Sequence, residues 1–250
     1  MPQRSYLASE QLNPDNLSAF GAERYRALLT SAEISSLREL ADGLPPSRAG
    51  ARLFGNPGLL DPLGPGGCIG RLARSILGAG SRPVRAVLFD KKATTNWAVP
   101  WHQDRTIAVR RRVEVTGFGP WSVKDGVPHV EPPFPVLASM ITLRAHLDDC
   151  DAENSPLLIA PGSHRLGRIA ATAASRLAAR LGSIACPAST GDVWVYATPI
   201  LHSSERSRSP NQRRVLHVDF APDDLPGGLE WMGIDDRSDE LAALPPGGSP

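Results

Sequence analysis

Two histidines and an aspartate are spaced so that they could bind one metal ion. A single residue, Gln103, separates His102 from Asp104, and the second histidine, His202, follows Asp104 by 98 residues. Residues two apart in a strand project from the same face, so His102 and Asp104 point together. Two neutral imidazoles and one carboxylate leave the opposite face of a divalent ion open. Non-haem Fe(II) uses this ligand set to bind a co-substrate and O₂. The spacing therefore predicts an Fe(II) site.

An arginine on a predicted strand could bind a carboxylate beside this site. Arg213 lies eleven residues beyond His202, in an alternating stretch, 211–220, that is typical of a strand. A buried guanidinium there could bind a carboxylate through two parallel hydrogen bonds. Arg214 competes for the role, because alternation puts it on the face that carries the apolar residues of the strand. Periodicity alone leaves the choice between the two arginines open.

Short motifs surround these residues in a fixed order. They are Trp101-His102-Gln103-Asp104, Leu147-Asp148-Asp149, Pro161-Gly162-Ser163-His164 and Gly191-Asp192-Val193-Trp194. Each motif alone is common, but in this order, with the distal histidine and arginine, they form a specific combination. Over residues 84–220 the combination resembles the phytanoyl-CoA dioxygenase family of Fe(II)/2-oxoglutarate-dependent oxygenases.

The resemblance implies roles for particular residues. Iron would be held by the triad, and 2-oxoglutarate would chelate it through its 1-carboxylate and 2-oxo group. The far carboxylate would reach Arg213, which the family spacing favours over Arg214, and Ser204 would assist. Less direct candidates for the co-substrate are Lys91 and Asn96, and for the substrate Arg144 and Trp121.

The implied reaction is hydroxylation, or another oxidation, of an unactivated C–H bond of a small molecule, with release of succinate and CO₂. Related halogenases lack the carboxylate ligand, whereas this chain keeps Asp104. Halogenation is therefore disfavoured, and hydroxylation and desaturation stay open. Two alternatives are a non-catalytic jelly-roll binding protein and a cupin-type metalloenzyme that does not use 2-oxoglutarate. The complete triad argues against the first, and cupins usually bring a cluster of histidines from one motif.

The pattern of elements favours one mainly β domain over residues 1–250, a double-stranded β-helix (jelly-roll, cupin-like barrel) with flanking helices. Thr30 and Glu33 resemble a capping box that opens a helix ended by Gly43. The expected parts are a helical support region at 1–80, a jelly-roll core at 84–220 that includes a strand at 137–147 and an inserted helix at 168–181, and a flexible tail at 244–250.

The segment 105–135 is long for a connection between two strands. Such segments are uncommon unless they cover a site, so we expect a lid. Its Arg110-Arg111-Arg112 run is more often a solvated charge run than a binding site for an anionic substrate.

Composition limits the partners. The formal net charge of +1 gives no reason to expect a nucleic acid or an anionic membrane as a partner. The three cysteines lack metal spacing, and no stretch has the length of a signal peptide or a membrane span, which favours a reduced, cytoplasmic protein. We expect a monomer or homodimer.

Overall fold

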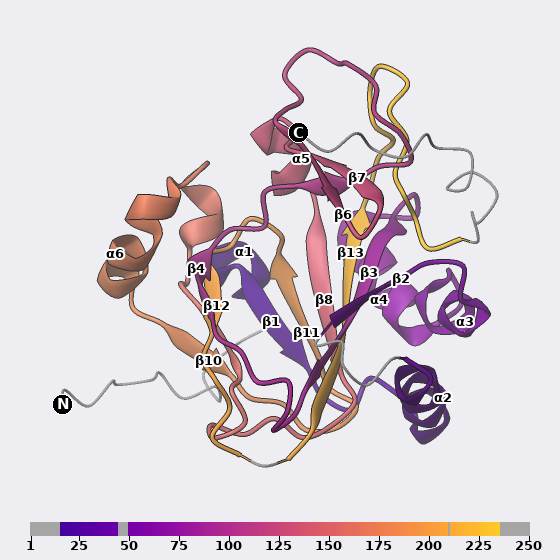
Figure 1. The fold of residues 1–250 in the computed structure, drawn as a ribbon, viewed down its shortest axis with the longest axis vertical. Helices are drawn as coiled ribbons and strands as arrows, with labels where there is room; N and C mark the ends of the chain where they lie inside the picture. The colour runs from indigo at the N-terminus through magenta and orange to yellow at the C-terminus, as the bar shows by residue number, and fades with distance from the viewer. Residues whose placement is uncertain (1–15, 45–49, 210, 236–250) are drawn as a thin grey trace.

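Residues 16–44, 50–209 and 211–235 are described by the computed structural model, and two antiparallel sheets form their centre (Figure 1). The major sheet has the strand order β1-β11-β8-β13-β3-β2, and the minor sheet has the order β10-β9-β12-β4. The major strands are β1 (Ala22–Tyr25), β2 (Gly50–Leu53), β3 (Arg82–Lys91), β8 (Ile141–His146), β11 (Val193–Ala197) and β13 (Arg213–Ala221). The minor strands are β4 (Val99–His102), β9 (Leu157–Ile159), β10 (Ile184–Cys186) and β12 (His202–Ser204). The predicted jelly-roll class is confirmed.

The two faces of the central strand β13 have opposite chemistry. On β13, Leu216, Val218 and Phe220 are buried in a core that also contains residues of the support helices. The alternate residues His217 and Asp219 face the other way, toward the minor sheet and the pocket, and are also buried. The apolar face of the strand is therefore the outside of the barrel, covered by helices, and the polar face lines its interior.

The support helices cover that apolar face. They are α2 (Ser31–Asp42), η2 (Pro57–Leu59), α3 (Leu60–Leu63) and α4 (Cys68–Leu77), preceded by the short α1 (Asn16–Phe20). The capping box is present, because Glu33 N donates to Thr30 Oγ1 at 3.2 Å and Thr30 N donates to Glu33 Oε2 at 2.8 Å. The helix ends at Gly43 as predicted. No helix within the described ranges has the length and apolar character needed to cross a membrane.

Three boundaries differ from the prediction. The region before residue 80 is not wholly helical, because β1 and β2 form the two edges of the major sheet. The predicted strand at 137–147 begins only at Ile141, since prolines start the short helix α5 (Phe134–Ala138). The inserted helix is α6 (Ala171–Leu181), flanked by η3 (Ser163–Arg165) upstream. The tail at 244–250 lies outside the described residues.

The segment 105–135 is a folded layer. It contains a three-stranded sheet of β5 (Ile107–Ala108), β7 (Val127–Val130) and β6 (Trp121–Lys124). The two-residue turn Asp125-Gly126 joins β6 to β7, and its φ angles of 50° and 77° suit a tight hairpin turn. Buried residues of the segment pack against Leu225 and Trp231 in a second core. That the segment closes over the site when substrate binds stays a prediction.

We predict that Leu143→Ala destabilises the fold by about 2–5 kcal/mol, because the lost side chain leaves a cavity in the helix-covered core. Leu143 lies on the central strand β8 and is 0% exposed. Val123→Ala is the control, since Val123 is 69% exposed, and it should change stability by less than ~0.5 kcal/mol. Urea unfolding measures both, and equal effects would contradict the placement of the core.

Candidate metal centre and co-substrate pocket

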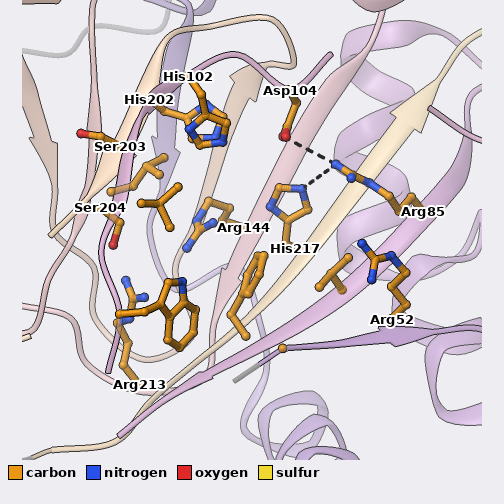
Figure 2. Close-up of a pocket in the computed structure, with 16 residues that line it drawn as sticks. Arg52, Arg85, His102, Asp104, Arg144, His202, Ser203, Ser204, Arg213 and His217 are labelled. Atoms are coloured by element: carbon orange, nitrogen blue, oxygen red, sulfur yellow. Dashed lines mark hydrogen bonds and ion pairs between the residues drawn. The ribbon is translucent and has the colours of Figure 1, made fainter. Parts of the chain in front are cut away.

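The two sheet elements β4 and β12 bring the predicted ligands together. In this antiparallel pair His202 lies directly opposite His102, and the two ring centroids are 4.2 Å apart. Asp104 follows two residues after the end of β4. Ligand atoms of the three side chains all lie within 4.8 Å of one another. Figure 2 shows these side chains on the same side of the pocket. One metal ion can therefore contact all three.

The imidazoles are oriented for metal binding. His102 Nδ1 lies 2.8 Å from the carbonyl oxygen of Pro100, and His202 Nδ1 lies 3.0 Å from that of Ile200. A carbonyl oxygen only accepts, so Nδ1 carries the proton in each ring and Nε2 is left with a free lone pair. Burial lowers the pKa of His202 to about 4, which keeps this ring neutral at neutral pH. The donor set fits a divalent transition metal.

Residues next to the ligands hold the two segments in place. Gln103 points away from the site, and its side chain donates to the carbonyl of Pro199 at 2.7 Å and accepts from Ile169 N at 2.9 Å. Ser163 Oγ, in the predicted Pro-Gly-Ser-His turn, accepts from Leu201 N at 2.8 Å. Both contacts fix the chain immediately before His202.

A buried ionic network stands behind Asp104. The guanidinium of Arg85 lies 3.5 Å from the carboxylate of Asp104 and 2.6 Å from that of Asp219. Asp219 is also 3.3 Å from His217 Nε2 and accepts from Thr142 Oγ1 at 2.8 Å. Burial raises the pKa of Asp104, but the charges of Arg85, His202 and His217 together outweigh this effect and bring the pKa below its ordinary value. The ligand carboxylate is thus ionised.

The metal ligands open onto a cavity of about 220 Å³. Its walls carry apolar groups from β3 and the loop after it, Val87, Phe89 and Trp97, together with Leu157. Figure 2 shows the histidines at one end and Arg213 at the other, with Arg144 between them.

Three basic side chains are buried in or beside this pocket: Arg213 at the end away from the histidines, Arg144 between them, and Lys91 opposite Arg213 on the neighbouring strand. Lys91, Arg144 and Arg213 are 1%, 7% and 2% exposed. No ion pair joins any of them to a carboxylate among the residues that the structure describes, and Nε of both arginines has no hydrogen-bond partner there. Burial lowers the pKa of Lys91 to about 7, and the charges of Arg213 and Arg144 add to this effect. This end of the pocket is therefore suited to an anion.

Two of the predicted co-substrate residues are joined at this end. Lys91 Nζ donates to Ser204 Oγ at 3.1 Å, to Ser155 Oγ at 2.9 Å and to the carbonyl of Glu205 at 2.8 Å. Arg213 Nη1 donates to the carbonyl of Ser155 at 2.6 Å. Ser204 also lines the cavity, two residues from the ligand His202. These contacts place Lys91, Ser204 and Arg213 side by side.

Arg214 points the other way. Its Nε and Nη2 each donate to a carboxylate oxygen of Asp148 at 2.9 Å, and Nη1 donates to Asp42 at 2.8 Å. These partners lie on the helix-covered outside of the sheet. Of the two arginines, Arg213 is the one that lines the cavity.

Two other residues that the sequence analysis proposed, Asn96 and Trp121, do not line the cavity. Asn96 exchanges hydrogen bonds of 2.8 Å with the backbone N–H and carbonyl of Ser207, so it fixes the loop after β12. Trp121 does not line the cavity; it packs beside the second core, with the Arg112 guanidinium 5.4 Å from its ring centroid. Arg112 itself pairs with Glu114 at the surface, as expected of a solvated charge run.

Several residues that line the pocket were not predicted. They are Arg85 on β3, Arg52 on β2 and His217 on β13, all strands of the major sheet. Arg85 shares a face of β3 with Val87, Phe89 and Lys91, and charged residues on the same face as apolar ones are a signal that could have pointed to the interior. The sequence alone does not show which charged residues are in contact, because that depends on how the strands pair.

The comparisons agree with this geometry. The family model described as Phytanoyl-CoA dioxygenase (PhyH) matches residues 69–215, more than half of the 250-residue chain. The chain belongs to this family. The predicted resemblance to the phytanoyl-CoA dioxygenase family of Fe(II)/2-oxoglutarate-dependent oxygenases is confirmed, and with it the enzyme class. No curated protein matches the sequence significantly.

Solved structures share the fold of this phytanoyl-CoA dioxygenase family member at low identity. EctD from S. alaskensis in its apo form has a TM-score of 0.63 and 15% identity, covering 95% of this chain and 84% of that chain. AviO1 from Streptomyces viridochromogenes Tue57 has a TM-score of 0.58 and 22% identity, covering 85% and 95%. The epimerase SnoN in complex with Fe³⁺, alpha ketoglutarate and nogalamycin RO has a TM-score of 0.58 and 16% identity, covering 85% and 88%.

We predict that Asp219→Asn weakens metal binding about ten- to a hundredfold. Without the Asp219 charge, Arg85 is free to pair with Asp104 and to compete with the metal for that carboxylate. Mn(II) titration followed by electron paramagnetic resonance measures the affinity. The double variant Arg85→Gln/Asp219→Asn removes the competitor and should recover part of the loss. An unchanged Mn(II) affinity in Asp219→Asn would rule out this role.

Proposed function

We propose that this protein oxidises an unactivated C–H bond of a small molecule and couples this step to conversion of 2-oxoglutarate to succinate and CO₂. His102, Asp104 and His202 hold Fe(II) in the proposal, and Arg213 binds the distal carboxylate of 2-oxoglutarate. The observation that carries it is a single pocket with three metal-binding side chains at one end and Arg213 at the other. Arg144 also lines the pocket and Lys91 lies beside Arg213, and none of these three basic side chains pairs with a carboxylate among the described residues.

Charge supports 2-oxoglutarate as the second ligand. Burying cations without counter-charges costs free energy, so an anion that fits this end of the pocket relieves that cost. A guanidinium matches the planar geometry of a carboxylate, which Arg213 would bind with its free donors. Lys91 and Ser204 lie beside it, and the carboxylate would favour the charged form of Lys91. The neighbour SnoN has been crystallised with iron and alpha ketoglutarate.

Each residue then has a task. When bound, Fe(II) supplies O₂ activation and couples it to decarboxylation of 2-oxoglutarate. His102 and His202 present Nε2 to the ion, while their Nδ1 protons stay on backbone carbonyls. Asp104 completes the face and stays ionised beside Arg85. Trp97 and Phe89 give the pocket apolar walls that limit the entry of water.

More than one outcome of the oxidation is compatible with this site. Asp104 is retained, which disfavours halogenation, but neighbours of this fold include an epimerase and a carbocyclase as well as enzymes named without a reaction. Hydroxylation is the outcome that we propose first.

The folded segment 105–135 is proposed as the cover of the pocket, since its hairpin turn reaches Arg52 at the pocket wall. We place the reaction in the cytoplasm.

We predict that the purified protein binds one Fe(II) per chain and produces succinate from 2-oxoglutarate. His102→Ala should lose metal affinity by at least about tenfold and should lose turnover, since one of three ligands is gone. Anaerobic Fe(II) titration and a succinate assay measure the two quantities. His164→Ala is a matched control outside the triad and should keep both. Wild-type iron content and turnover in His102→Ala would show that the ion binds elsewhere.

We predict that Arg213→Ala raises the Kd of 2-oxoglutarate by about ten- to a hundredfold, because a charge-assisted contact contributes about 1.5–3 kcal/mol. Arg214→Ala should change this Kd by less than about threefold, although it should lower stability by breaking the contact with Asp148. Binding is measured with Mn(II)-loaded protein so that both variants carry equal metal. A larger loss of affinity in Arg214→Ala would mean that the co-substrate binds on the other face of β13.

A further inference from the structure

The pocket has a third region, away from both the metal ligands and Arg213. It is formed by Gly50 and Arg52 on β2, by Val87 and Phe89 on β3, and by His217 on β13. Figure 2 shows Arg52 at the opposite side of the pocket from Arg213, with its guanidinium directed toward Arg85 and His217. Neither the metal nor the co-substrate site uses this region.

Arg52 has donors to spare. One of its terminal nitrogens pairs with the carboxylate of Asp125 at the hairpin turn. Its Nε is buried and has no partner within the described part of the chain. A guanidinium carries five N–H donors, so a single carboxylate on one nitrogen does not saturate it. Asp125 is also half-exposed, at 49%, whereas Arg52 is 24% exposed. The arginine therefore keeps free binding capacity at the pocket wall.

The surroundings of Arg52 are short of negative charge. Lys124 donates to the hydroxyl of Thr106 at 2.9 Å, and burial together with the charges of Arg85 and Arg52 lowers its pKa. Asp219 neutralises Arg85. When Asp104 binds a metal ion, the described carboxylates left for Arg52, Arg85 and Lys124 are those of Asp125 and Asp219. With the metal bound, this region therefore has an excess of positive charge.

The apolar wall beside Arg52 limits what the anion can be attached to. Val87 and Phe89 project from the same face of β3 as Arg85, and both line the pocket between Arg52 and the metal ligands. A ligand that spans this distance needs an apolar part against these two side chains and a charged end at Arg52.

We propose that the substrate is a small organic carboxylate whose carboxylate group binds Arg52 and whose apolar part lies against Phe89 and Val87. The inference rests on the proposed function, since it takes the metal and 2-oxoglutarate sites as given. Two separated cationic regions allow the pocket to hold two carboxylate ligands at once, one at Arg213 and one at Arg52, without competition between them.

A purely structural role for Arg52 makes a different prediction. If Arg52 serves only to tie the β6–β7 hairpin to β2, then removing Asp125 should have the same consequence as removing Arg52. If Arg52 binds substrate, then Asp125→Asn removes a competing carboxylate and should preserve or strengthen anion binding. Asp125→Asn is therefore the matched control.

The test uses the full-length protein, loaded anaerobically with Mn(II) and saturating 2-oxoglutarate, with benzoate, benzamide and phenylphosphonate as probes. Calorimetry should show that benzoate binds at least about tenfold more tightly than its neutral isostere benzamide. Arg52→Gln should raise the Kd of benzoate about tenfold or more and leave the Kd values of Mn(II) and 2-oxoglutarate within about twofold. Asp125→Asn should leave the Kd of benzoate equal or lower. Arg52→Lys, which keeps the charge without the planar fork, should lie between wild type and Arg52→Gln.

Several outcomes would overturn the proposal. They are equal binding of benzoate and benzamide, an unchanged benzoate Kd in both Arg52 variants, or the same loss in Asp125→Asn as in Arg52→Gln. Tighter binding of phenylphosphonate than of benzoate would overturn the carboxylate in favour of a phosphorylated substrate. If wild-type protein fails to bind Mn(II) and 2-oxoglutarate, the proposed function fails and the inference fails with it. Normal co-substrate binding without discrimination among the probes overturns the inference alone.

Discussion

The antiparallel pairing of β4 with β12 is the constraint on which the site depends. It sets His202 opposite His102, and Asp104 follows on the same face as His102. Because side chains alternate along a strand, a slip of one residue in this pairing would turn one histidine away and leave no metal site. The register is held from outside the site. Gln103 binds the backbone at Pro199 and Ser163 binds the backbone at Leu201, so both ligand segments are tied to each other through residues that never touch the metal.

The charged residues of the major sheet lie mostly on its inner face and the helices cover its apolar outer face, and this arrangement has an energetic consequence. The helices bury the apolar face of the major sheet, which stabilises the fold without any help from the pocket. The interior can then carry Lys91, Arg144 and Arg213 close together, although like charges repel and desolvation disfavours them. A co-substrate with a carboxylate at this end would offset that cost. Burial of the outer apolar face therefore offsets the unfavourable free energy of the clustered cations. An anion that binds them relieves that cost, which increases its affinity for the pocket.

Local signals in the sequence predicted the elements that local interactions determine. The capping box of α2, the spacing of His102 and Asp104, and the distal position of His202 could all be read from short motifs. Periodicity alone could not show which of Arg213 and Arg214 lines the cavity, because the apolar face of β13 meets helices rather than the pocket. The role of β1 and β2 as edge strands could not be predicted, since pairing with β11 and β3 is decided by contacts distant in sequence. Arg85 and Arg52 were missed for the same reason. Their partners are 134 and 73 residues away.

The network behind Asp104 also joins the two sheets. Arg85 and Asp219 belong to β3 and β13 of the major sheet, whereas Asp104 continues from β4 of the minor sheet. Arg85 lies between the two carboxylates, closer to Asp219, so its charge is largely neutralised within the major sheet and the oxygens of Asp104 stay free for an ion. A metal on the triad would then hold two strands of the minor sheet and, through Asp104 and Arg85, the wall of the major sheet. A ligand that binds only the folded state stabilises that state by about 2.7 kcal/mol when the free ligand concentration is a hundred times its Kd. Metal loading should therefore tighten the mouth of the pocket as well as supply its chemistry, because the same carboxylate serves the ion and the contact between the sheets.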